Sequence, residues 1–251
     1  MVEAFVIGWN ESETIHLTLK HYFGFCEKVT LYDNYSTDGT PDIARSMGAE
    51  VKQFGTPGVL SDDDYLTVKN NCWKKSKADW VFVGDADEVL MSKRTQSIMC
   101  VIDWAQQDGA TIFKPIGWDI YSNHMPEDLR DVQHGFLNDN YSKTVLFNPK
   151  KIREINFKYG CHVSKPVGDV VFSKWQLFLL HYRNIGGPQR IVQRHALYRS
   201  RMSERNIRFG LGVHYMTPDM HPQGITDEQR IKEWYDKYDG CNELSLAGLG
   251  Y

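Results

Sequence analysis

The stretch that decides the fold of this chain is residues 79–88, which read DWVFVGDADE. Residues 79–83 form a short apolar run, which is typical of a strand buried in a parallel sheet. The run leads directly into an acidic turn at residues 84–88. Because ligands bind beyond the carboxyl ends of the strands in open parallel sheets, a binding site is expected at this turn.

Upstream of this stretch the same alternation of apolar runs and amphipathic segments repeats. Strands are predicted at residues 4–9, 28–32, 50–54 and 79–83, and a fifth follows at 111–116. Asn10 is expected to cap a first helix that reaches residue 23, and Thr40-Pro41 is expected to begin a second helix. Ser61 is expected to cap a third helix that continues through residue 78, and a fourth helix is expected at residues 95–107. Such alternation predicts βαβ units and an α/β fold with a mostly parallel central sheet flanked by helices.

The second half of the sequence has a looser pattern. Strand-like pieces occur at residues 143–147 and 170–175, and helices are expected near 188–202 and 227–238. No internal repeat or linker separates two units, so we expect a single Rossmann-like domain over residues 1–251 with a decorated C-terminal half. Decorations of this kind commonly carry substrate specificity.

Composition excludes several classes of protein. The 251 residues are 41% hydrophobic and 24% charged with a formal net charge of −3, which gives no general field for nucleic acid. The five cysteines (Cys26, Cys72, Cys100, Cys161 and Cys241) form no CxxC pair, so reduced thiols in the cytoplasm are expected. The N-terminus does not resemble a signal peptide, and no apolar run is long enough for a transmembrane segment.

Asp85 and Asp87 are the strongest candidates for chemistry. Two carboxylates two residues apart at a strand end can hold a divalent cation, which would neutralise the charge of a nucleoside diphosphate leaving group. A second D-x-D match, Asp62 and Asp64, is explained by the preference for acidic residues in the first helical turn after Ser61.

Other polar residues are expected at the same edge of the sheet. Trp9-Asn10-Glu11 follows the first strand, and Asp33, with Asn34 and Ser36, follows the second. Asp33 can contact a ribose or a base edge, although an Asx turn also accounts for this loop. Lys69 could reach a phosphate from the middle of its helix, and His162 or His181 could complete a metal shell with a neutral imidazole.

Taken together, residues 9–11, 33–40 and 79–88 resemble, in order and spacing, the GT-A glycosyltransferases of the family-2-like type. The resemblance implies a GT-A fold, a nucleotide-sugar donor that is usually UDP-linked, and Mn²⁺ or Mg²⁺ at Asp85 and Asp87, and it favours His162 and His181 as further ligands. The first motif and Asp33 would hold the nucleoside. The candidate nucleotide-binding residues are then Trp9, Asn10, Glu11, Asp33, Asn34, Ser36, Lys69, Asp85 and Ala86.

The chain departs from that family in one respect. Many inverting members carry a catalytic-base aspartate in a Glu-Asp pair well after the D-x-D motif, and no such pair is present. Asp119 and Asp139 are the nearest substitutes, and Asp87 is the remaining catalytic candidate. Whether the anomeric configuration is retained or inverted is therefore left open.

The function expected from the sequence is metal-dependent transfer of a hexose or pentose from a nucleotide sugar to a glycan, a glycoconjugate or another hydroxyl acceptor. Residues 1–117 would bind the donor, and residues 118–251 would form the acceptor side. Two alternatives remain. One is a haloacid-dehalogenase-like phosphatase with Asp85 as nucleophile, since Asp85-Ala86-Asp87-Glu88-Val89 matches its motif. The other is a non-catalytic nucleotide- or glycan-binding protein.

Overall fold

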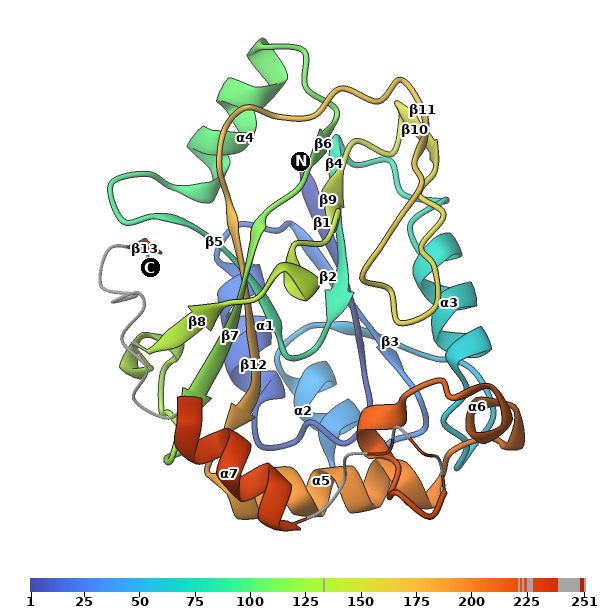
Figure 1. Cartoon of the computed structure of the whole chain (residues 1–251). Coiled ribbons are helices and arrows are strands. Elements are labelled where there is room, and N and C mark those ends of the chain that lie inside the picture. The colour runs from blue at the N-terminus through green and yellow to red at the C-terminus, as the bar shows by residue number, and fades with distance from the viewer. Residues whose placement is uncertain (133, 221, 223, 225–227, 239–248, 251) are drawn as a thin grey trace.

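The computed structural model describes all residues except 133, 221, 223, 225–227, 239–248 and 251. Within that part the chain has an α/β fold around a six-stranded central sheet of order β3-β2-β1-β4-β9-β6 (Figure 1). Its strands are β1 Val2–Gly8, β2 Lys28–Asp33, β3 Glu50–Gln53, β4 Trp80–Asp85, β6 Ile112–Phe113 and β9 Leu146–Phe147.

The first four strands of this sheet are parallel, as the sequence predicts. β1 lies between β2 and β4, and its register pairs Gly8 with Asp33 and Ile7 with Asp85. The carboxyl ends of β1, β2 and β4 therefore meet at one edge. β9 and β6 complete the sheet, and β9 pairs antiparallel with both β4 and β6.

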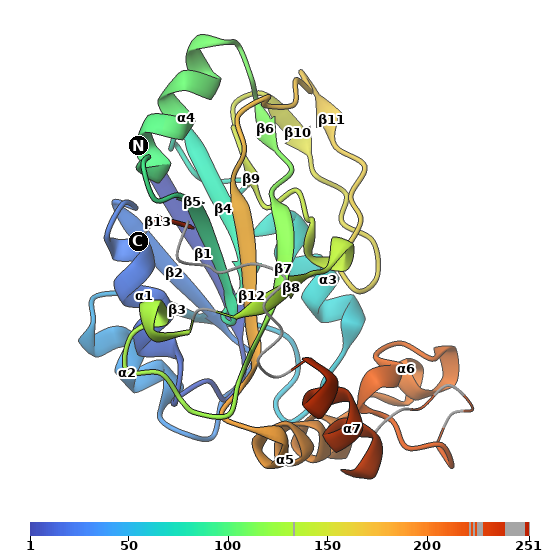
Figure 2. The same cartoon turned by 60° about the vertical axis from the view of Figure 1, so that its left-hand side comes forward.

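Helices cover both faces of the central sheet (Figure 2). Because side chains alternate along a strand, Ala4 and Val6 of β1 pack with α1, α2 and α4, whereas Phe5 and Ile7 pack on the opposite face, where α3 lies. The bounds of these helices are α1 Ile15–Phe23, α2 Thr40–Ser46, α3 Asp62–Asn71 and α4 Ile98–Gln107.

A second sheet, of order β13-β5-β12-β7-β8, begins directly after the acidic turn. β5 pairs antiparallel with β12, which in turn pairs parallel with β7. Neither β5 nor β12 was predicted. The bounds here are β5 Glu88–Lys93, β7 Ile116–Ser122, β8 Gly135–Leu137, β12 Phe178–Ile185 and β13 Leu249–Gly250, and a separate pair is formed by β10 Ile152–Glu154 and β11 Val167–Gly168.

The last helices lie across the carboxyl edge of the strands (Figure 1). Ile191 of α5 and Ile231 and Tyr235 of α7 pack on Tyr121 of β7, which fixes α5 and α7 against the second sheet. The helices are α5 Pro188–Ser200, α6 Glu204–Phe209 and α7 Glu228–Tyr238, and the short 3-10 turns are η1 Leu129–Asp131, η2 Asp139–Tyr141 and η3 Val213–Tyr215.

Helix starts were predicted better than helix ends. Ser61 caps α3 by accepting a hydrogen bond from the Asp64 amide, and Pro41 lies in the first turn of α2, both as predicted. The helix predicted through residue 78 ends at Asn71, and α4 begins only after its cap, Ser97. The prediction that Asn10 caps the first helix was wrong, because the backbone of Asn10 is left-handed and α1 begins after Thr14.

Two predicted strands differ from the structure. The strand expected at 111–116 is divided, since β6 belongs to the central sheet and β7 to the second. The strand expected at 170–175 does not form, and Phe172 makes only an isolated bridge to Ile112. Asp227, at the predicted start of the last helix, and Cys241 lie outside the described residues.

Two further features of the described part concern its cysteines and its helices. Cys26, Cys72, Cys100 and Cys161 are free thiols. Among the helices whose residues are described, none has the length and apolar character that a membrane span requires.

Gly117 provides a test of how tightly the second sheet packs. A Cβ at this position would lie 2.2 Å from the Tyr141 carbonyl carbon and 2.5 Å from the Ser142 amide nitrogen. Because both are backbone atoms, Gly117→Ala should displace the turn at residues 138–142 and lower the free energy of unfolding by about 1–3 kcal/mol. Urea denaturation measures this loss, and an unchanged midpoint would mean that the turn moves without cost.

The packing of His21 and His195 predicts acid sensitivity. Burial lowers the pKa of His21 to about 4, although its Nε2–H donates to the Leu90 carbonyl, and burial lowers the pKa of His195 to about 3. Since an unfolded histidine has a pKa near 6.5, the unfolded chain binds more protons below that pH. Stability is thus fully present above pH 6.5 and falls as the pH drops.

We expect each such histidine to contribute up to about 1.4 kcal/mol of this loss per pH unit between pH 6.5 and 5. Urea unfolding at pH 7, 6 and 5 measures how steeply the free energy of unfolding falls with pH. His21→Gln should make this fall less steep by the contribution of one titrating histidine. The His21 contribution would be excluded if the slope of the variant equalled that of the wild type.

Candidate active site

The acidic turn between β4 and β5 is anchored to three other elements. The Ala86 amide donates to the Ile7 carbonyl at 2.8 Å, and the Tyr182 amide donates to the Asp87 carbonyl at 2.7 Å. The Thr18 hydroxyl donates to the Ala86 carbonyl at 2.7 Å. The turn is therefore fixed to β1, β12 and α1, and the carboxylates beside it project from a rigid backbone.

Asp85 lies against two buried lysines. The Lys69 Nζ is 2.6 Å from its Oδ1, and the Lys143 Nζ is 3.7 Å from its Oδ2. Burial alone would lower the pKa of Lys69, but the Asp85 carboxylate outweighs burial and holds that pKa above its usual range. Lys69 therefore stays charged in the site, where it balances Asp85.

Glu88 and Lys143 form a second ion pair, which sequence reasoning missed. Both side chains are buried, and the carboxylate also accepts a hydrogen bond from the Asp85 amide at 3.1 Å. Burial tends to raise the pKa of Glu88, but the charges of Lys143 and Lys69 lower it below its usual value. Glu88 was visible inside the decisive stretch, whereas Lys143 lies 55 residues away and had no local signal.

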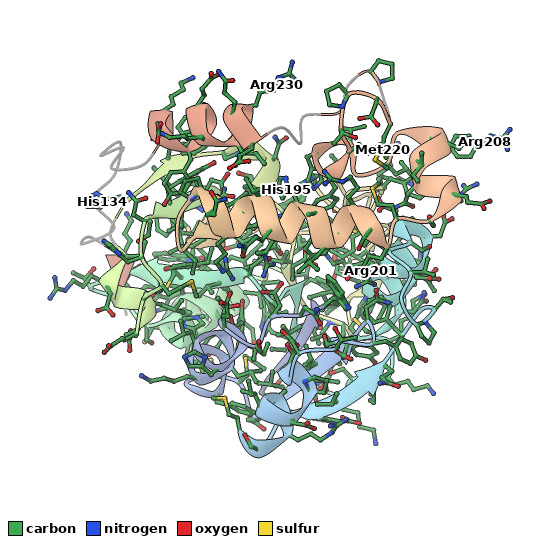
Figure 3. The ribbon with its side chains drawn as sticks, turned by 90° about the horizontal axis from the view of Figure 1, so that it is seen from below. His134, His195, Arg201, Arg208, Met220 and Arg230 are labelled. Carbon is green, nitrogen blue, oxygen red and sulfur yellow. The ribbon has the colours of Figure 1, made fainter. Side chains whose placement is uncertain are left out.

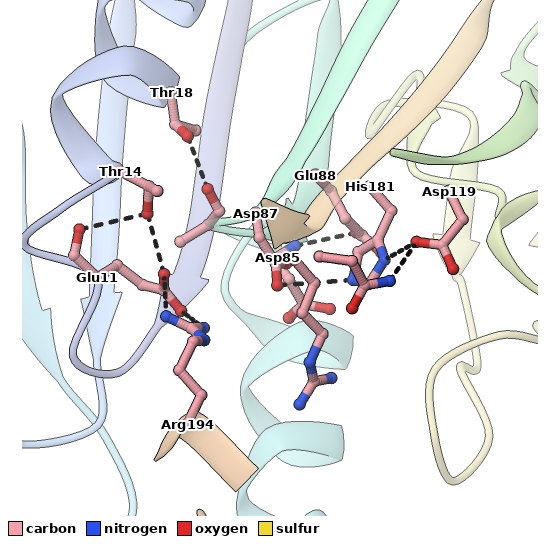
Figure 4. Close-up of polar contacts among 12 residues, drawn as sticks. Glu11, Thr14, Thr18, Asp85, Asp87, Glu88, Asp119, His181 and Arg194 are labelled. Carbon is pink, nitrogen blue, oxygen red and sulfur yellow. Dashed lines mark hydrogen bonds and ion pairs between the residues drawn. The ribbon is translucent and has the colours of Figure 1, made fainter. Parts of the chain in front are cut away.

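Asp87 faces a histidine that a second carboxylate orients. The His181 Nε2 is 3.5 Å from the Asp87 Oδ2, and its Nδ1 is 2.9 Å from the Asp119 Oδ1 (Figure 4). The imidazole also stacks on Tyr141, with ring centroids 3.9 Å apart. Asp119 is itself held by the Asn184 amide at 3.2 Å. His181 is therefore fixed in both position and rotation.

The charges of this group are mutually dependent. Burial alone would lower the pKa of His181, but Asp87 and Asp119 raise it to about 9. Burial would raise the pKa of Asp87, yet His181 together with Arg183 and Arg194 holds it below its usual range. In the absence of a ligand, Asp87 is an anion balanced by a cationic imidazole.

Glu11 is bound by an arginine from the far end of the chain. Arg194 of α5 donates two hydrogen bonds to its carboxylate, at 2.6 and 3.0 Å, and the Thr14 hydroxyl donates a third at 3.0 Å (Figure 4). Glu11 is only 3% exposed. A buried bidentate pair of this kind links the first strand end firmly to α5.

The loop after β2 is built around Asn10 and Asp33. The Asn10 amide donates to the Ser36 hydroxyl at 2.8 Å, and its side-chain Oδ1 accepts from the Thr37 amide at 2.8 Å. One oxygen of Asp33, Oδ2, accepts from the Ser36 amide at 3.0 Å, as in the Asx turn considered above. Asn10 and Ser36 are therefore engaged in shaping the loop.

A cavity of about 170 Å³ lies at the meeting point of these groups. Of the predicted residues, those that line it are Glu11, Lys69, Asp85, Ala86, Asp87 and His162. The others, which are Trp9, Asn10, Asp33, Asn34, Ser36, Asp119, Asp139 and His181, do not line it. The cavity also touches α3 through Asp62 and Tyr65, and it is closed by His214 and Tyr215 of η3.

The two substitutes for a catalytic base are not at this cavity. Asp119 is buried behind His181, and Asp139 is exposed in η2. The position of Asp119 follows from the second sheet, which was not predicted and which places Asp119 beside His181 of β12. His162 does line the cavity, with its Nδ1 2.7 Å from the Asn140 carbonyl.

In the described part of the chain, no three His, Cys, Asp or Glu side chains gather closely enough to form a metal shell by themselves. The predicted set of Asp85, Asp87, His162 and His181 is therefore not assembled as a four-ligand site. Asp87 and His181 of this set face each other, with the His181 Nε2 3.5 Å from the Asp87 Oδ2.

Sequence reasoning also missed the contribution of α5. Arg194, Tyr198 and Arg201 are spaced i, i+4 and i+7, so they share one face of the helix end. Tyr198 packs edge-on against Trp9, with ring centroids 5.3 Å apart. The helical spacing of these three residues is visible in the sequence, but the surface that they contact is determined by the fold.

Comparison with known proteins identifies glycosyltransferases. No family model matches the chain. It is 30% identical over 110 residues to an uncharacterized glycosyltransferase of Rickettsia prowazekii, over 43% of this chain and 35% of that protein. An uncharacterized glycosyltransferase of Rickettsia bellii is 29% identical over 107 residues, 43% of this chain and 34% of its own length. The chain thus spans about a third of these relatives, and over the matched stretch the predicted resemblance to glycosyltransferases is confirmed.

Solved structures give a weaker likeness. The glucosyl-3-phosphoglycerate synthase of Mycobacterium tuberculosis, in complex with Mn²⁺, UDP and glucosyl-3-phosphoglycerate, is 15% identical with a TM-score of 0.33, over 47% of this chain and 44% of that one. The mannosyl-3-phosphoglycerate synthase of Rubrobacter xylanophilus is 18% identical with a TM-score of 0.33, over 51% and 42%. The α/β fold class predicted from the sequence is confirmed by the strand order and helices of the chain itself.

The buried Glu88–Lys143 pair provides a stability test of the site. Lys143→Met should lower the free energy of unfolding by about 3–5 kcal/mol, because it leaves a buried carboxylate without its cation. Adding Glu88→Gln should restore more than half of that loss, since the remaining amide needs no counter-charge. Urea denaturation of the two single variants and the double variant measures the coupling. Additive losses would mean that the two side chains act independently.

Proposed function

We propose that this chain is a glycosyltransferase that moves a hexose or pentose from a nucleotide sugar, with UDP-sugars favoured, to a hydroxyl group of a glycan or glycoconjugate. The observation that carries the proposal is the convergence at one cavity of Glu11 from the β1 end and of Asp85 and Asp87 from the β4 end, beside buried Lys69. The glycosyltransferase relatives support the same class of reaction.

The proposed division of the domain follows from this convergence. Residues 1–117 would bind the donor, with the nucleoside near Trp9 and Asp33 and the diphosphate near the acidic turn. Residues 118–251 would form the acceptor side and cover the donor, in keeping with the position of α5 across the carboxyl edge (Figure 1) and with the lining of the cavity by His214 and Tyr215 of η3.

Asp87 and His181 would suit a divalent cation that displaces the proton from the His181 Nε2. The Nδ1–H of His181 is directed at Asp119, so that its Nε2 faces the Asp87 carboxylate. Mg²⁺ and Mn²⁺ bound to nucleotides commonly take only one or two protein ligands, and the phosphates and water supply the rest. A bound cation would act as a Lewis acid that stabilises the negative charge of the departing diphosphate. Asp119 would act as a positioning residue, because it fixes the imidazole.

The cationic side chains of this chain would bind the donor diphosphate. Lys69 and Lys143 lie buried beside Asp85, and Arg183 and Arg194 contribute positive charge at Asp87. In a buried site such fixed charges act more strongly than they would in water, and they need no reorganisation as charge develops. Since neither Asp119 nor Asp139 lines the cavity, we assign no base to the acceptor hydroxyl.

A thermal-shift panel tests the proposal. UDP, GDP, CDP and ADP are each added with and without Mn²⁺. We expect UDP with Mn²⁺ to raise the melting temperature by about 5–10 °C at roughly a hundred times its dissociation constant, since binding then adds about 2.7 kcal/mol. If another nucleotide gives the largest shift, the proposed donor is a sugar linked to that nucleotide and not to UDP. If none shifts the curve, the proposed function fails.

Asp87→Asn separates the metal-binding role from folding. We expect this variant to fold normally, to lose the Mn²⁺-dependent part of the shift, and to lose nearly all sugar transfer, because an amide binds a divalent cation more weakly than a carboxylate. Asp64→Asn is the matched control, since Asp64 belongs to the other D-x-D match and does not line the cavity. Equal nucleotide shifts for both variants would contradict the role of Asp87.

A further inference from the structure

The residue after α5, Arg201, covers the place expected for the nucleoside. Its guanidinium lies 3.9 Å from the centroid of the Trp9 ring. Its Nη2 donates to the Asn34 side-chain oxygen and, at 3.0 Å, to the Val59 carbonyl. Figure 3 shows Arg201 at the end of α5 and directed into the molecule, whereas Arg208 projects outward.

The residues beneath Arg201 are those that the sequence assigned to the nucleoside. Trp9 and Asn34 are in direct contact with it, and Asp33 is close enough to raise its pKa. None of these three lines the 170 Å³ cavity, which ends at Glu11 and Leu60 on this side. Cavities that bind drug-sized ligands commonly measure about 300 Å³ or more, so a nucleotide sugar needs more room than this cavity offers.

The contact also leaves buried polar atoms without partners. Among the described residues, the Nε and Nη1 of Arg201 and the Oδ1 of Asp33 have no hydrogen-bond partner. Arg201 is only 7% exposed and Asp33 is fully buried. Native structures rarely leave such groups unpaired. Burial outweighs the nearby negative groups and lowers the pKa of Arg201 below its usual value.

We propose that Arg201 is an internal stand-in for the nucleobase, and that a nucleotide displaces it from Trp9. A guanidinium is planar, stacks on an aromatic ring and donates N–H groups, and a nucleobase with an N–H on its edge shares these three properties. Once Arg201 leaves, the base stacks on Trp9 and donates to the free Asp33 Oδ1. This inference rests on the proposed function, because it requires that the chain bind a nucleotide.

Displacement needs only the side chain of Arg201 to move. Its backbone is tied to the segment before α3, where the Leu60 amide donates to the Arg201 carbonyl at 2.6 Å and the Ser203 amide donates to the Leu60 carbonyl at 2.9 Å. Asn206 adds two hydrogen bonds to Asp62, at 2.8 and 3.1 Å. These bonds can persist while the guanidinium turns out. The nucleotide therefore binds against an internal competitor that is always present.

Calorimetric titration of UDP in the presence of Mn²⁺ tests the proposal on the full chain. Arg201→Met keeps the aliphatic stem and removes the planar cation, so we expect it to bind UDP roughly three- to thirtyfold more tightly than the wild type, the range of a cation–π contact. Arg201→Lys keeps the charge without the planar group, and it should give a smaller gain. Arg208→Met is the control, because Arg208 is exposed on α6, and its affinity should equal that of the wild type.

The outcomes separate this inference from the proposed function. Tighter binding by both Arg201 variants, with an unchanged Arg208 variant, supports displacement. Equal or weaker binding by the Arg201 variants overturns it and leaves nucleotide binding intact, and weaker binding would make Arg201 a ligand contact instead. If neither the wild type nor any variant binds UDP, GDP, CDP or ADP, the proposed function fails and this inference fails with it. Melting temperatures of all variants confirm that they are folded, and Arg201→Lys carries the test if Arg201→Met does not fold.

Discussion

The parallel hydrogen-bonded register of β1 between β2 and β4 is the constraint on which the rest of the structure depends. It places the ends of three strands at one edge, with Gly8 opposite Asp33 and Ile7 opposite Asp85. The approach of β1 to the acidic turn is so close that a Cβ at Gly8 would lie 2.9 Å from the Cβ of Ala86. Any side chain there would push the turn away, and the carboxylates would move with it.

Four carboxylates at this edge are each paired with a cationic side chain. Asp85 is matched by Lys69, Glu88 by Lys143, Glu11 by Arg194 and Asp87 by His181. Buried pairs add little net stability, because desolvation offsets much of their attraction. What they provide is a fixed arrangement of charge. A diphosphate bound as proposed would meet cations that are already oriented, and it would compete with the carboxylates for them.

The parts of the molecule that were predictable from the sequence are those encoded locally. Apolar runs identified β1, β2 and β4, and cap chemistry identified Ser61, because strands and caps depend on neighbouring residues. The contacts of Lys143 and Arg194 join positions 55 and 183 residues apart, and no local pattern encodes such pairings. The same limit explains Asp119. Its residue type suggested chemistry, but only the pairing of β7 with β12 determines that it orients His181 and does not face the cavity.

Because β12 pairs with two neighbouring strands, some positions along it accept an inserted or deleted residue more easily than others. Its register is regular from Phe178 to His181 and shifts between His181 and Asn184. Because side chains alternate along a strand, one residue inserted before His181 would turn the imidazole to the opposite face of the sheet. The irregularity after it can absorb an extra residue, as bulges do. Homologous chains should therefore accumulate insertions and deletions after His181, while the spacing from Phe178 to His181 stays constant.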